Sequence, residues 1–154
     1  MRVHTLVREQ VLPGAPEEIF EFFAEPLNLE AITPPLLRFR VVTPQPIEMR
    51  AGTILQYRLR LRGLALDWLT RIAEWAPGER FVDEQLVGPY RLWHHTHEFE
   101  PCDGGTLMRD TVRYALPLWP LGELAAPIVR RELRRIFDYR REQCAARLSR
   151  PSLH

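Results

Sequence analysis

Two histidines and one aspartate have the residue types and the spacing that proton-transfer chemistry needs. His95 and His97 alternate along one segment with Trp93 and Phe99, and the residues between them are polar. Successive side chains of a β-strand point to opposite faces, so the two aromatic residues take both histidines to the inner face. A following segment places Asp110 among apolar residues in the same alternation. A histidine beside a carboxylate is held in one tautomer and can act as a general base near neutral pH.

The loop between these two segments determines whether the three groups meet. Residues 102–105 read CDGG, a composition typical of a hairpin turn. If both apolar faces point inward, Asp110 lies directly across from His95 or His97, with the Cβ atoms about 5 Å apart. We therefore predict that His95, His97 and Asp110 form the candidate catalytic group.

Further side chains on the inner face of the expected strands would complete a binding site. Buried polar groups cost free energy unless they are paired. The cluster is therefore either a satisfied network that orders the pocket or anchors the polar end of a ligand, or an acid–base pair that moves a proton. The predicted ligand-binding residues are Tyr57, Trp68, Thr70, Asp83, Gln85, Trp93, Met108 and Tyr114.

A metal site is another interpretation of the same residues. The H-x-H pattern on a strand places two imidazoles on one face, and Asp110 could complete a set of two histidines and one carboxylate. The pair loosely resembles the start of a cupin motif, but no histidine follows His97 before His154. We therefore predict neither a metal nor another cofactor.

The composition excludes several classes of function. All 21 basic residues are arginine, so there is no lysine for a Schiff base or for a P-loop. A net charge of +1 argues against nucleic acid as the main partner. Only two cysteines, Cys102 and Cys144, fit a reducing compartment. No apolar stretch reaches the roughly 20 residues of a transmembrane helix, so we expect a cytoplasmic protein.

The period of the hydrophobic residues predicts one α+β domain over residues 1–154. A strand over residues 3–12 precedes two short helices, the first opening at Pro16 and the second over residues 27–32. A two-residue period between residues 39 and 116 predicts six further strands in an antiparallel sheet. Residues 121–149 predict one long helix that covers the sheet, with a cavity between them. Its expected apolar stripe is Leu121, Leu124, Ile128, Leu133, Ile136, Phe137, Cys144 and Leu148.

This predicted C-terminal helix is rich in arginine, with eight arginines against three acidic residues beyond residue 129. The asymmetry fits an anionic partner such as RNA, a ribosome or a lipid surface. It also fits a solvated face on which Glu132 pairs with Arg135, and Asp138 with Arg134 or Arg141. In either case we expect the arginines of this chain to lie on the outside of the molecule.

The order of elements, together with several local strings, resembles the helix-grip fold of the SRPBCC superfamily. That superfamily includes START lipid-binding domains, birch-pollen-type allergens and polyketide cyclase/dehydrase-like proteins. The strings look most like a bacterial branch whose role is poorly defined. They are FF at 22–23, PLNL at 26–29, ITP at 32–34, FVDEQ at 81–85, GPY at 88–90, the WxHxHxF of residues 93–99, and GT at 105–106 with Met108, Asp110, Val112, Tyr114 and Pro117.

The resemblance implies a curved sheet of about seven strands wrapped around the long C-terminal helix. It implies a small apolar or amphipathic ligand, such as a lipid, a quinone or a polyketide-like compound, in an internal pocket. If side chains fill that pocket and leave no cavity of about 300 Å³ or more, both the binding hypothesis and the enzyme hypothesis fail. The first alternative is a cofactor-free enzyme of the cyclase, dehydratase or isomerase type with a His–Asp proton shuttle. The second is an interaction module that uses the arginine-rich helix. The oligomeric state stays open, with a dimer as one alternative.

Overall fold

The computed structural model describes residues 1–148, and its elements follow the predicted order. Seven strands, three α-helices and two short 3₁₀ helices make up the described chain. They are β1 (His4–Leu12), α1 (Pro16–Ala24), α2 (Pro26–Ala31), η1 (Pro35–Leu37), β2 (Arg40–Val41), β3 (Ile54–Leu61), β4 (Leu64–Ala76), β5 (Arg80–Val87), β6 (Leu92–Cys102), β7 (Gly105–Ala115), η2 (Leu121–Ala125) and α3 (Ala126–Leu148).

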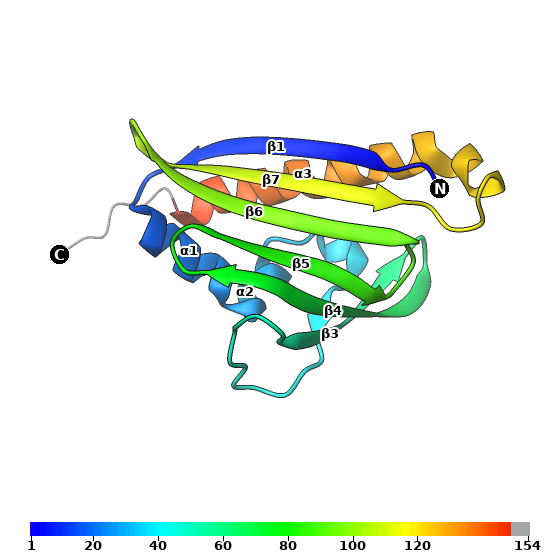
Figure 1. Ribbon diagram of the computed structural model, residues 1–154, viewed down its shortest axis with the longest axis horizontal. Coiled ribbons are helices and arrows are strands. Elements are labelled where there is room, and N and C mark those ends of the chain that lie inside the picture. Colours follow the sequence, from blue (N-terminus) through cyan, green and yellow to red (C-terminus); the bar gives the residue numbers. More distant parts are fainter. Residues whose placement is uncertain (149–154) are drawn as a thin grey trace.

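The strands form one antiparallel sheet in the order β1-β7-β6-β5-β4-β3-β2 (Figure 1). Hairpins join β3 to β7 in sequence, and β1 completes the sheet beside β7. The helical segment between β1 and β2 therefore connects the two outer strands of the sheet. The register pairs Cys102 with Gly105 and His97 with Asp110, which confirms the predicted hairpin and places β5, β6 and β7 side by side.

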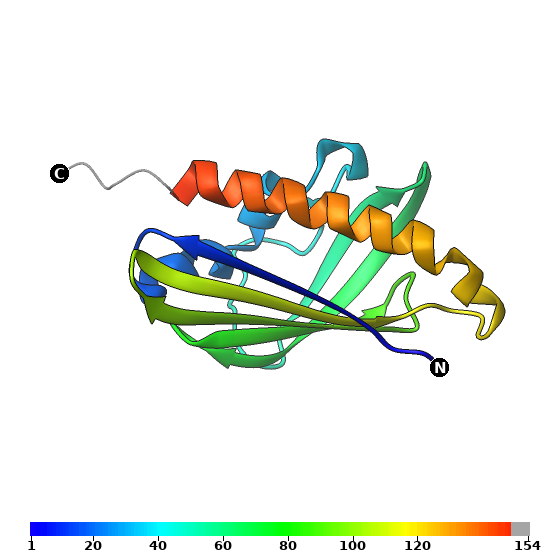
Figure 2. The same ribbon diagram turned by 90° about the horizontal axis from the view of Figure 1, so that it is seen from above.

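The long helix α3 runs along one face of the sheet, which curves up around it on the β3–β4 side (Figure 2). Its buried side chains include Val129, Leu133, Phe137 and Cys144, which recur at helical spacing. Near one end of α3, the phenylalanines of α1 join Phe81 and Phe99 of the sheet in a hydrophobic cluster. This arrangement is the helix-grip α+β fold that the sequence predicts.

The predicted apolar stripe of the C-terminal helix is wrong in its first part. Residues 121–125 form the 3₁₀ helix η2, and the α-helix begins at Ala126 with Pro127 in its first turn. Leu121, Leu124 and Ile128 are exposed. At about 100° per residue, Ile128 lies on the opposite side of α3 from the buried Leu133 and Phe137. Residue 149, the predicted end of the helix, lies outside the described residues.

Two acidic side chains of α3 pair with arginines of the strands and not with those of their own helix. Glu132 lies 3.2 Å from Arg62 at the end of β3, and Asp138 lies 2.7 Å from Arg8 of β1. The predicted pairs within the helix are therefore wrong. Across residues 1–148, no helix is both long and apolar enough to span a membrane.

Candidate functional site

Three neighbouring strands bring the predicted chemical groups together on the inner face of the sheet. In the register, Asp83 of β5 lies opposite His95 of β6, and His97 lies opposite Asp110 of β7. Both histidines and Asp110 are buried. The two imidazoles of β6 therefore lie between a carboxylate of β5 and a carboxylate of β7.

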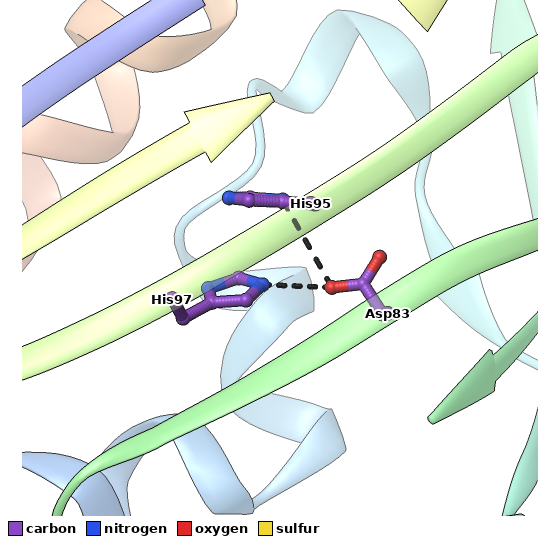
Figure 3. Close-up of side chains that lie close together, drawn as sticks. All are labelled: Asp83, His95 and His97. Carbon is purple, nitrogen blue, oxygen red and sulfur yellow. Dashed lines mark hydrogen bonds and ion pairs between the residues drawn. The ribbon is translucent and has the colours of Figure 1, made fainter. Parts of the chain in front are cut away.

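The four side chains form a continuous hydrogen-bonded cluster. Nε2 of His97 lies 2.7 Å from Oδ2 of Asp83, and Nε2 of His95 lies 2.8 Å from Oδ1 of Asp110. Nδ1 of His97 also lies 3.3 Å from the same Asp110 oxygen. The two imidazole rings stack with their centres 3.7 Å apart. Figure 3 shows both rings from β6 on one side of the Asp83 carboxylate.

Arg140 of α3 completes the cluster, although the arginines of this chain are predicted to lie on the outside of the molecule. Its Nη2 lies 3.6 Å from Oδ1 of Asp110 and 3.4 Å from Nδ1 of His97. Its guanidinium also lies over the rings of Phe23 and Phe137, at 5.5 and 5.7 Å. The side chain is 12% exposed, so the prediction that all arginines lie outside is wrong.

A signal for this inward arginine was present in the sequence. Leu133, Phe137 and Cys144 are buried on one face of α3, and position 140 falls at the same helical spacing. The arginine seemed to interrupt the apolar stripe, but it continues that stripe as the partner of a buried carboxylate. An arginine at a core position of an amphipathic helix therefore indicates a buried acid on the facing sheet.

The surroundings hold both carboxylates in their charged form. Burial alone would raise the pKa of Asp110, but the positive charge of Arg140 and hydrogen bonds from both histidines hold that pKa well below its ordinary range. Burial likewise opposes the charge on Asp83, yet the hydrogen bond from His97 and the neighbouring His95 lower its pKa. Both groups therefore act as hydrogen-bond acceptors only.

The pKa values of the two histidines shift in opposite directions because only His97 lies close to both carboxylates. Burial lowers the pKa of His95 to about 4, helped by the neighbouring His97 and opposed by the hydrogen bond with Asp110. Burial also disfavours a charge on His97, but its hydrogen bonds with Asp110 and Asp83 outweigh burial and raise its pKa. His95 is therefore neutral at pH 7, whereas the two carboxylates stabilise a proton on His97, and Arg140 supplies a positive charge beside Asp110.

This protonation pattern leaves one lone pair unused. Because ionised Asp110 can only accept, the single proton of neutral His95 sits on Nε2, and Nδ1 carries none. Nδ1 of His95 lies 3.9 Å from Oδ2 of Asp83, and no other described residue forms a hydrogen bond with it. Two acceptors thus face each other across a gap that a donor would fill. We call Asp83 and Nδ1 of His95 the polar corner.

The polar corner opens into a cavity of about 160 Å³ between the sheet, α3 and the α2–η1 segment. Among its lining residues, Leu37, Met49 and Leu61 are half-buried and mark where the cavity approaches the surface. This volume does not reach the roughly 300 Å³ set for the pocket hypotheses, so the cavity admits only a small ligand or the buried part of a larger one. The aromatic lining residues are Phe23, Phe39, Tyr57, Trp68, Phe81, Tyr90, Trp93 and Phe137.

Four of the predicted ligand-binding residues line this cavity, namely Tyr57, Trp68, Asp83 and Trp93. Burial and the charge of Asp83 raise the pKa of Tyr57, so its hydroxyl stays neutral and can donate a hydrogen bond. No other described residue forms a hydrogen bond with that hydroxyl.

The other four predicted residues lie away from the cavity lining. The Thr70 hydroxyl donates to the backbone carbonyl of Glu84. Gln85 bonds to both backbone groups of Tyr90 and so holds the turn between β5 and β6. Met108 and Tyr114 are buried in separate hydrophobic clusters.

Three residues of the cluster could offer ligands to a metal ion. One ligand atom from each of Asp83, His95 and His97 lies within 4.8 Å of the others. Asp83 therefore takes the place of Asp110 in the set of two histidines and one carboxylate that the sequence suggested as metal ligands. The cluster, however, already contains the charged guanidinium of Arg140, and its carboxylates stabilise a proton on His97. A divalent ion would add positive charge beside Arg140, and we assign none to the site.

The chain resembles known proteins in sequence pattern and in structure. Residues 12–138 match the family described as "Polyketide cyclase / dehydrase and lipid transport". No curated protein sequence matches the chain.

Similar solved structures include protein CV1439 from Chromobacterium violaceum, with a TM-score of 0.75, 19% identity, and coverage of 96% of this chain and 99% of that one. The Zhui aromatase/cyclase from Streptomyces sp. R1128 has a TM-score of 0.78 at 12% identity, covering 97% and 95%. The di-domain ARO/CYC StfQ from the steffimycin biosynthetic pathway has a TM-score of 0.70 at 19% identity, covering 96% of this chain and 51% of that one. At these identities the likeness establishes the fold.

Proposed function

Because the chain belongs to the polyketide cyclase/dehydrase and lipid transport family, we propose that it binds a small, largely apolar molecule in the cavity, with a hydroxyl group of that molecule in the polar corner. The observation that carries this proposal is the gap between Nδ1 of His95 and Asp83, 3.9 Å across and bordered by two acceptors. A ligand hydroxyl has one proton to donate, and the charged carboxylate of Asp83 is the stronger of the two acceptors for it.

The rest of the lining favours an apolar body for the ligand. Aromatic and aliphatic side chains make up most of it, so binding removes apolar surface from water and is favourable. Besides the cluster and Tyr57, the polar groups of the lining are few. A ring system that carries one hydroxyl therefore fits the lining better than a polyol or a free ion does.

The cavity volume limits the size of the buried part. At about 160 Å³, the cavity is smaller than most pockets for drug-sized ligands, which start at about 300 Å³. One or two fused rings fit inside, and a longer ligand would extend past the half-buried Leu37, Met49 and Leu61.

A proton-transfer reaction of the cyclase or dehydratase type is the second candidate, favoured by the bare Nδ1 of His95 beside the cavity. Nδ1 could accept a proton from a ligand hydroxyl or an activated carbon. Its pKa of about 4 makes it a weak base at pH 7, because general bases work best with a pKa near the operating pH. Binding is therefore the better supported function.

The test uses 2-naphthol, two fused rings with one hydroxyl, and its methyl ether, 2-methoxynaphthalene, as the probe that cannot donate. We expect calorimetry to show binding of 2-naphthol at least tenfold tighter than binding of the ether, because a hydrogen bond to a charged group contributes about 1.5–3 kcal/mol. Asp83→Asn should abolish most of this preference. Equal affinities for the two probes in the wild type would contradict the proposal.

A blocked cavity provides the matched control. Ile136 lines the cavity from α3, whereas Ile128 lies on the same helix and is exposed. Ile136→Trp should abolish the binding of 2-naphthol, and Ile128→Trp should leave it unchanged. If Ile136→Trp still binds 2-naphthol, the probe binds elsewhere and the assignment of the ligand to this cavity is wrong.

A further inference from the structure

A contiguous run of large apolar side chains lies exposed where β7 leads into α3. Their exposed fractions are 81% for Leu118, 55% for Trp119, 73% for Leu121, 82% for Leu124 and 60% for Ile128. Single exposed apolar residues are ordinary, but five within eleven consecutive residues concentrate exposed apolar surface in one segment, and such a concentration marks an interaction site. We call these five residues the exposed apolar patch.

Two arginines extend this patch along the outer face of α3. Arg131 and Arg135 follow Ile128 by three and seven residues, a spacing that places all three side chains on one side of the helix. Neither arginine forms an ion pair with another residue in the range 1–148. The nearby acids Glu132 and Asp138 are instead engaged by Arg62 and Arg8, so the two positive charges remain uncompensated.

We propose that the exposed apolar patch, together with Arg131 and Arg135, docks on the surface of a lipid bilayer that contains anionic lipids. Leucine, isoleucine and tryptophan side chains bury favourably at the boundary between headgroups and acyl chains. Each arginine beside them gains roughly 1 kcal/mol from anionic headgroups. The patch combines both contributions on one exposed surface.

Charge complementarity selects this occupant over two others. In a two-fold dimer built on this face, the arginines of one copy would approach those of the other, and like charges in an interface are unfavourable. A nucleic acid would satisfy the arginines but would leave five apolar side chains against phosphates or water. Only a bilayer surface matches both the apolar and the cationic part.

The position of the patch suits a protein that exchanges an apolar ligand with a membrane. Glu132 lies one helical turn beyond Ile128, and its pair with Arg62 joins α3 to the end of β3. The next residues, Leu133 on α3 and Leu61 on β3, line the cavity. The docked face therefore borders the cavity, although docking itself does not depend on which ligand the cavity holds.

The test is co-sedimentation of the full chain with vesicles of phosphatidylcholine alone and of phosphatidylcholine with about one-third phosphatidylglycerol. We expect binding to the anionic vesicles at 0.1 M salt, with at least tenfold weaker binding to the neutral ones and at 0.5 M salt. Arg131→Gln with Arg135→Gln should weaken binding about 30-fold. Leu124→Ser with Ile128→Ser should do the same or more.

The controls are Leu36→Ser, which removes an 88% exposed leucine outside the patch, and Arg58→Gln on β3. Both should bind vesicles as the wild type does, and circular dichroism should show all variants folded. The proposal is overturned if anionic vesicles are not bound at 0.1 M salt, or if patch variants bind like the controls. It is equally overturned if the wild type sediments as a dimer that Ile128→Ser dissociates, or binds a single-stranded RNA in preference to vesicles.

Discussion

Acidification from pH 6.5 to 4.5 should destabilise the fold through His95. Burial lowers the pKa of this side chain from 6.5 to about 4, so between these pH values the unfolded chain binds a proton that the folded chain does not. Stability then falls as the pH falls, by up to 1.36 kcal/mol per pH unit. With these two pKa values, the loss between pH 6.5 and 4.5 is about 2 kcal/mol.

Urea unfolding at the two pH values measures this loss, and a His95→Gln variant isolates it. Glutamine stays neutral and can still donate a hydrogen bond to Asp110, so its stability should change about 2 kcal/mol less than that of the wild type over the same interval. His94→Gln, which changes the neighbouring histidine on the other face of β6, should keep the wild-type pH dependence. If His95→Gln shows the same pH dependence as the wild type, then His95 is not a buried neutral histidine and the assignment of its protons is wrong.

Three further predictions concern the charged partners of His95. Because the pKa of His97 is raised in the folded chain, its contribution to the free energy of unfolding is fully present below pH 6.5 and is lost as the pH rises through the folded-state pKa. Urea unfolding should therefore show stability declining on the alkaline side in the wild type and declining less in His97→Gln. Asp110→Asn leaves Arg140 and His97 without their shared carboxylate and should lower the free energy of unfolding by about 3 kcal/mol, whereas Asp103→Asn in the exposed turn should change it by less than about 0.5 kcal/mol. Arg140→Met should cost at least about 1 kcal/mol less in the Asp110→Asn background than in the wild type, and additive losses would show that the two side chains do not interact.

The fold was predictable because its signals are local and repeated. Alternation along β3, β6 and β7 identifies the inner face, and the turn sequence at residues 102–105 fixes which residues of β6 and β7 meet. These two facts place Asp110 across from His95 or His97, and the structure selects His97. The resemblance of the element order to a known fold added the helix that covers the sheet.

The missing parts of the site depend on contacts between distant segments. Arg140 reaches Asp110 only because α3 crosses the sheet above β6 and β7, and no local pattern fixes that crossing. The hydrogen-bond partner of each histidine also cannot be predicted from the strand register alone. His97 lies opposite Asp110 in the register, yet its shortest bond is to Asp83 on the other neighbouring strand. Rotamers chosen by packing decide such diagonal contacts.

The exposed face of α3 was mispredicted for a different reason. At about 100° per residue, Leu121, Leu124 and Ile128 share one face of a helix, and Leu133, Phe137 and Cys144 share the opposite face. The predicted stripe combined residues of both faces, and its first three residues lie on the surface. The segment before Ala126 also forms a 3₁₀ helix in place of the predicted α-helix. Three prolines at positions 117, 120 and 127 are the sequence signal for this irregular start.

Nitrogen-15 NMR of the histidine side chains, recorded near pH 7 without and with 2-naphthol, tests the polar corner most directly. The structure predicts that His95 carries its proton on Nε2 and none on Nδ1. It also predicts that 2-naphthol shifts the Nδ1 resonance of His95, because the probe's hydroxyl donates to Asp83, whose Oδ2 lies 3.9 Å from Nδ1. The methyl ether should leave that resonance in place. A protonated Nδ1 on His95 would contradict this assignment. An Nδ1 resonance that does not shift when 2-naphthol is bound in the cavity would also contradict it.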